Sequence, residues 1–189
     1  GKNTIDATNP QYASVTMNNN GSNTFRADFV YKKGFEVNVG TYHYVAIMGD
    51  FENILRNCDF DIPEGSSTTA GNIIFDAGGQ FGQWHGNNSK NGKTNSPIKT
   101  DIEGVSVWYY EMLGDFGKEQ NTFLSTIENT TVSEDNEFQF KMADLKVTNV
   151  PDGATVTSPQ YKIYWIGFFN NTSEIQAMID QTEAAVAAE

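Results

Sequence analysis

The sequence predicts an all-β protein, an antiparallel jelly-roll β-sandwich with a short C-terminal helix. Most apolar segments alternate large and small or polar residues with period two, which is typical of half-buried strands. Clusters of Gly, Pro, Asn and Asp separate these segments, as at 63–65 and 151–153. Only the end of the chain has helical spacing, and 189 residues are enough for one core without disulfides or metals.

The strands are expected where the alternation is clearest. The segment 161–169 is the most strand-like, and 42–48 is a longer apolar run that indicates a central strand. The remaining predicted strands are 25–31, 35–39, 72–76, 105–112, 137–142 and 144–147. Residues 1–24 are rich in Asn and Thr and contain few large apolar residues, so we expect a partly ordered lead-in before a sandwich domain at 25–170.

A helix is predicted over 171–189. Ser173 followed by Gln176 fits a capping box, with Ser173 as the N-cap. The apolar face is formed by residues at helical spacing: Ile175, Met178, Ile179, Thr182 and Val186. Such a helix either packs on the edge of the sandwich or leads to a connector.

The charge balance excludes some partners. The formal net charge is −12, from 12 Lys and Arg against 24 Asp and Glu, and the chain has no basic cluster. Nucleic acid and anionic membrane surfaces are therefore excluded as expected partners. No apolar run reaches transmembrane length, so no membrane insertion of this domain is expected.

The glycine-rich stretch 75–88 predicts a binding site for a polysaccharide or oligosaccharide. Flat rings beside amide side chains suit sugars, whose C–H faces are apolar and whose hydroxyls form hydrogen bonds. The candidate ligand-binding residues here are Trp84, Phe81, His85, Asn87 and Asn88, with Trp84 as the main ring. The alternative is a turn whose Trp84 folds back to cover the core.

Trp108 is a further candidate ligand-binding residue. Strand alternation places it on one face with Ser106 and Tyr110, and Ser106 indicates a wetter face. The alternative is a strand that is buried on both faces. Trp165, by contrast, is expected in the core.

No catalytic motif is present, and no enzyme is expected. A glycosidase pair of carboxylates remains the third hypothesis, with candidates Asp76, Asp101, Glu103 and Glu111. No cofactor is expected. A structural calcium ion is an open alternative, because Asp59 and Asp61 alternate in a short segment. The sequence does not assign the ligands of such an ion.

The runs at 42–47, 137–144, 161–169 and 173–175 give the chain a likeness to one type of domain. From 25 to 180 it resembles the galactose-binding-like jelly-roll modules of secreted bacterial polysaccharide-utilisation proteins, many of unknown function. The resemblance implies a secreted or cell-surface protein, anchored by lipid through a segment outside this sequence. It implies non-catalytic glycan binding, or a role as a structural spacer that contacts other domains or proteins. Binding residues vary among such modules, so the resemblance assigns no binding residue in this chain.

Overall fold

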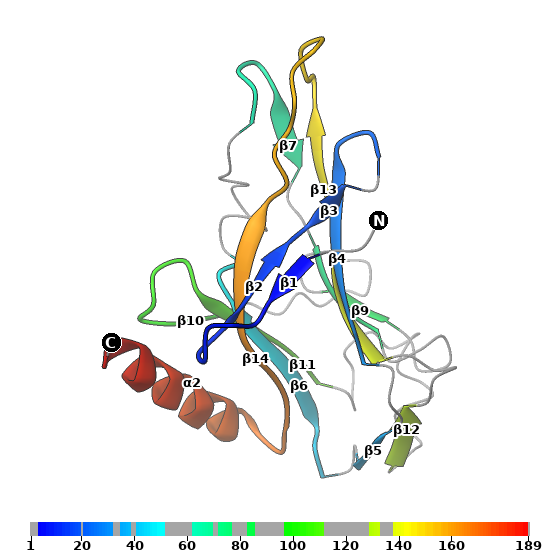
Figure 1. The fold of residues 1–189 in the computed structure, drawn as a ribbon. Helices are drawn as coiled ribbons and strands as arrows, with labels where there is room; N and C mark the ends of the chain where they lie inside the picture. The colour runs from blue at the N-terminus through cyan, green and yellow to red at the C-terminus, as the bar shows by residue number, and fades with distance from the viewer. Residues whose placement is uncertain are drawn as a thin grey trace.

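The computed structural model describes residues 4–19, 21–31, 35–38, 41–51, 62–69, 72–76, 83–85, 97–111, 129–132 and 138–188. Within these residues the fold consists of antiparallel sheets in a sandwich-like arrangement and one C-terminal helix (Figure 1). The predicted fold class is therefore confirmed.

The first sheet has six strands, and every neighbouring pair in it is antiparallel. In spatial order they are β1 (Thr4–Asp6), β2 (Ala13–Thr16), β14 (Gln160–Phe169), β6 (Tyr44–Gly49), β11 (Ser106–Glu111) and β10 (Ile98–Lys99).

The second sheet is built around β13 (Phe138–Thr148). Its path is β3 (Asn18–Asn19), β4 (Thr24–Tyr31), β13, β8 (Asn72–Asp76) and β9 (Gln83–His85), and β7 (Ser67–Thr69) pairs with the far end of β13. A separate ribbon pairs β5 (Phe35–Asn38) with β12 (Asn129–Val132). The chain passes repeatedly between the two main sheets, as the jelly-roll prediction requires.

The N-terminal segment is part of the sandwich, so the prediction of a partly ordered lead-in at 1–24 is wrong for the described residues. β2 lies between β1 and β14 in the first sheet, and β3 joins the second sheet. Val15 and Met17 are fully buried between these strands. Two well-placed apolar side chains are enough to dock a segment whose overall composition is polar.

Both faces of the first sheet are covered. One face packs against helix α2 (Thr172–Ala187), and its buried cluster contains Ala46, Met48, Val105, Val107, Ile175 and Ile179. The other face turns toward the second sheet (Figure 1). The helix therefore lies on a sheet face and not on the sandwich edge.

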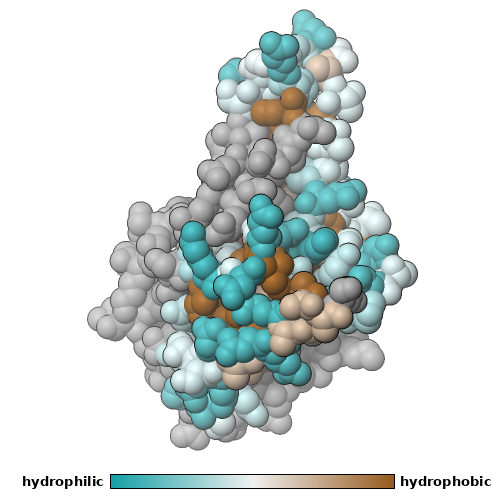
Figure 2. Space-filling model, turned by 90° about the vertical axis from the view of Figure 1, so that its left-hand side faces the viewer, coloured by the Kyte–Doolittle hydropathy of each residue, from teal (hydrophilic) through white to brown (hydrophobic). Residues whose placement is uncertain are grey.

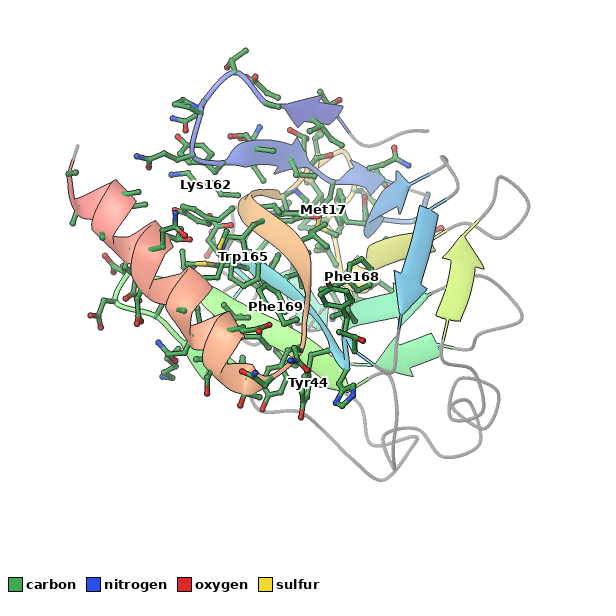
Figure 3. All side chains as sticks on the ribbon, turned by 90° about the horizontal axis from the view of Figure 1, so that it is seen from below. Met17, Tyr44, Lys162, Trp165, Phe168 and Phe169 are labelled. Carbon is green, nitrogen blue, oxygen red and sulfur yellow. The ribbon has the colours of Figure 1, made fainter. Side chains whose placement is uncertain are left out.

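A β-bulge in β14 changes which residues share a face. The register shifts between Ile163 and Trp165, so Tyr164 and Trp165 both pack against the cluster under α2. Figure 3 shows Trp165 and Phe169 on the side toward the helix and Phe168 on the opposite side. Trp165 is a core residue as predicted, and its Nε1 donates to Thr182 Oγ1 at 3.0 Å. Regular alternation would instead place Trp165 on the same face as Ile163.

The helix begins earlier than the predicted capping box. The N-cap is Asn171, whose Oδ1 accepts from Glu174 N at 3.0 Å, while Glu174 Oε2 accepts from Asn170 N at 2.8 Å. Ser173 is already inside the first turn. The predicted apolar face is confirmed by the burial of Ile175 and Ile179.

Asn171→Ala is expected to lower the free energy of unfolding by about 1 kcal/mol, because the Glu174 amide loses its acceptor. Urea unfolding measures the change. Asn171→Ser keeps an acceptor and is expected to leave stability within a few tenths of a kcal/mol. Equal losses in both variants would contradict the capping role.

Candidate functional site

The structure describes only part of the predicted glycine-rich site. Phe81, Asn87 and Asn88 lie outside the described residues, and Trp84 and His85 are described as backbone of β9. In β9, Trp84 pairs with Phe75, which pairs with Phe140, which pairs with Phe29. Trp84 is therefore the last of a series of aromatic residues paired across neighbouring strands, and it lies at the edge of the second sheet. Whether the candidate side chains around Trp84 share one surface stays a prediction.

Trp108 does not lie on an open face. Its side chain is 3% exposed, and Ser106 beside it is 0% exposed. Both occupy the face of β11 that turns away from α2, toward the second sheet (Figure 1). Of the two alternatives, the strand buried on both faces is the one that the structure shows.

A group of polar and aromatic side chains meets on the helix-facing side of the first sheet. We call it the Asp50 cluster: Tyr12, Asp50, Lys162 and Tyr164. All four side chains are partly exposed. The view onto the carboxyl end of α2 shows apolar residues in the middle of this side of the molecule, surrounded by hydrophilic ones (Figure 2).

The strand register brings these four residues together. Ile163 pairs with Ala13 of β2 on one side and with Gly49 of β6 on the other. Tyr12 precedes Ala13 and Asp50 follows Gly49, so they flank β14 from its two sides. Tyr164 packs against the cluster under the helix, and strand alternation places Lys162 on the same face.

Aromatic, cation–π and hydrogen-bond contacts link the four residues of the cluster. The Lys162 ammonium lies 4.5 Å from the centre of the Tyr12 ring, a cation–π distance. The Tyr12 and Tyr164 ring centres are 5.8 Å apart and tilted by 58°. Asp50 Oδ1 accepts a hydrogen bond from Lys162 N, and Asp50 N donates to Lys162 O at 3.2 Å.

The Asp50 carboxyl group is unusual electrostatically. Burial raises its pKa to about 6, against the opposing effects of the Lys162 amide and ammonium. The same burial, together with the negative charge of Asp50 and the neighbouring Tyr12, raises the pKa of Tyr164. Asparagine would accept the same hydrogen bond from Lys162 N without a desolvated charge. An ionisable group kept at a cost to stability is a mark of a functional site.

The loop that carries Tyr12 is held by its own side chains. Asp6 Oδ1 accepts from Thr8 N, and Asn9 Oδ1 accepts from Gln11 N and Tyr12 N at 2.8 and 3.3 Å. Gln11 Nε2 donates to Ala185 O at 3.2 Å, which ties the loop to the last turn of α2. Tyr12 is therefore presented in a fixed position, which reduces the entropy that a ligand must overcome.

The other predicted groups are less informative. Asp101 and Glu103 are exposed, and the side chains of Asp76 and Glu111 lie outside the described residues. Asp59 and Asp61, the calcium candidates, also lie outside them. Among the described residues, no His, Cys, Asp and Glu gather into a group that could hold a metal ion. No helix in the described part of the chain has the length and apolar character needed to cross a bilayer.

Sequence reasoning missed the Asp50 cluster. Tyr12 belongs to the segment that the sequence predicts as a partly ordered lead-in, and Asp50 follows shortly after a predicted strand. The signal available was Gly49-Asp50 at the end of a buried apolar run, a place where a strand end presents polar groups. The bulge that brings Trp165 to the same face as Tyr164 cannot be read from the alternation.

Fold and cluster together define an antiparallel β-sandwich domain with a partly exposed aromatic and carboxyl site under its C-terminal helix. A protein-family model matches residues 2–175, and its description is "Domain of unknown function (DUF4979)". The match covers most of the chain, so the chain belongs to this family. No curated protein and no solved structure matches it.

Proposed function

We propose that this domain binds a polysaccharide or oligosaccharide without catalysis, as a module of a secreted or surface-anchored bacterial protein. The observation that carries the proposal is Asp50, a desolvated carboxyl group in one cluster with two tyrosine rings that contact each other. The resemblance to galactose-binding-like modules points to the same class of ligand.

The chemistry of the Asp50 cluster suits a sugar. A tyrosine ring offers an apolar face at low entropic cost, because it has only two torsions. A carboxylate accepts hydrogen bonds from hydroxyl groups, and these charge-assisted bonds are stronger than neutral ones. The cluster contains one carboxyl group, whereas hydrolysis of a glycosidic bond uses a pair. Binding is therefore a better match than hydrolysis.

The first test compares the two candidate sites. A glycan array identifies a retained glycan, and isothermal titration measures its affinity for Tyr12→Ala and Trp84→Ala. We expect Tyr12→Ala to weaken binding about tenfold through the loss of ring stacking, with Tyr12→Phe as the control that keeps the ring. Normal affinity in Tyr12→Ala with loss in Trp84→Ala would place the site at the edge of the second sheet.

Binding is expected to depend on pH through Asp50. If hydroxyl groups donate to the ionised carboxyl group, only that form binds, and at pH 5 it is the minor form for a pKa of about 6. The apparent Kd is therefore expected to rise about tenfold between pH 7.5 and pH 5. Titration calorimetry at the two pH values measures it, and an affinity that stays constant would show that the ionised Asp50 is not involved.

A further inference from the structure

We infer that the Asp50 cluster selects neutral glycans and rejects those that bear carboxylate or sulfate groups. This inference rests on the proposed function and adds a substrate class to it. It follows from the charges that the fold places around the two tyrosine rings.

Two parts of the fold bring negative charge to the cluster. The Asp50 carboxylate lies at the end of β6, against β14. The carboxyl end of α2 reaches the same place, since Ala185 O accepts from Gln11 next to Tyr12. The carbonyl groups at a helix C-terminus carry partial negative charge, and the last turn of α2 has no basic residue to offset it.

The charge of the whole chain adds to this field. The chain as a whole carries a net charge of −12, so the long-range field also repels anions.

One cation faces these groups in the cluster. The Lys162 ammonium lies over the Tyr12 ring and beside Asp50, which it partly neutralises. A ligand with an anionic group would therefore meet an excess of negative charge at close range. A neutral sugar offers hydroxyl donors, which the carboxylate accepts without repulsion.

The test uses matched probes that differ at one carbon. Galacto-oligosaccharides and oligogalacturonides of the same length and linkage differ by a hydroxymethyl group against a carboxylate, and gluco- and glucurono-oligosaccharides form a second pair. Each is titrated into the intact domain at pH 7.5, in low salt and in 0.5 M salt.

We expect the neutral member of a pair to bind at least tenfold more tightly than the acidic member in low salt. The ratio is expected to shrink in 0.5 M salt, because exposed charges are then screened. Lys162→Met, which removes the cation and keeps the stem, is expected to widen the ratio further. Equal binding of both members, or preference for the acidic one, overturns the inference and leaves the proposed function standing. Binding of no neutral or acidic glycan in the array overturns the proposed function itself.

Discussion

The Asp50→Asn variant is expected to fold more stably than the wild type at pH 7 and to bind its glycan at least tenfold more weakly. Asparagine keeps an acceptor for Lys162 N, so the link between β6 and β14 survives. The buried negative charge disappears, and with it the acceptor that makes charge-assisted bonds to ligand hydroxyls. A gain in stability joined to a loss of function is the pattern expected of a group kept for binding.

The stability difference has a defined pH dependence. The folded state holds the Asp50 proton more tightly than the unfolded state, because the pKa is about 6 against an ordinary value of 3.8. The contribution of this group to stability is therefore fully present below pH 3.8 and is lost as the pH rises through 6. At pH 7 the ionised group costs about 3 kcal/mol, since a shift of one pKa unit corresponds to about 1.4 kcal/mol.

Urea unfolding of both proteins between pH 4 and pH 7 measures this difference. The advantage of Asp50→Asn is expected to grow across that range and to level off above pH 6. Asp180→Asn on the exposed surface of α2 is the matched control for the loss of a carboxylate. A variant that is less stable than the wild type at pH 7 would mean that the Asp50 charge supports the fold.

Gly49→Ala is expected to be strongly destabilising, by about 3 kcal/mol, with a fall in melting temperature of about 10 °C. A Cβ atom at Gly49 would stand 2.6 Å from Lys162 O and would overlap the Phe51 ring. The backbone oxygen cannot move away, since β6 and β14 are paired there and Asp50 N donates to the same oxygen. Thermal unfolding followed by circular dichroism measures the loss.

Gly167→Ala is the matched control, in the neighbouring strand of the same sheet. Its Cβ would stand 3.0 Å from the Phe169 ring, which is a partly exposed side chain with freedom to shift. We expect a loss of no more than about 1 kcal/mol. Equal losses in the two variants would contradict the close approach of β6 and β14 at Gly49.

The sequence was sufficient for the fold class because period two is strong in the long strands. The segments that became β4 and β13 alternate clearly, the segment that became β6 is a longer apolar run, and the helical face of α2 is spaced regularly. The short strands β1, β2 and β3 were missed, because two or three buried residues such as Val15 and Met17 give too little periodicity. The sequence predicted the N-cap at Ser173 and not at Asn171, because Ser and Asn cap helices equally well.

The candidate site could not be predicted in the same way. Tyr12, Asp50, Lys162 and Tyr164 come from three strands or their ends, and only the pairing of β14 with both β2 and β6 brings them together. The raised pKa of Asp50 comes from burial, which a sequence does not display. Trp108 was predicted on a water-exposed face because Ser106 is polar, but both side chains are buried.

The central claim is that Asp50 is a desolvated acid kept for a ligand. The most direct test is the titration of its side-chain carboxyl carbon by NMR, first in the free domain and then with the neutral glycan retained on the array. We expect a midpoint near pH 6 in the free domain and a lower midpoint in the complex, because hydroxyl donors favour the ionised form. A free midpoint near the ordinary value of 3.8, or one that the glycan leaves unchanged, would contradict the claim.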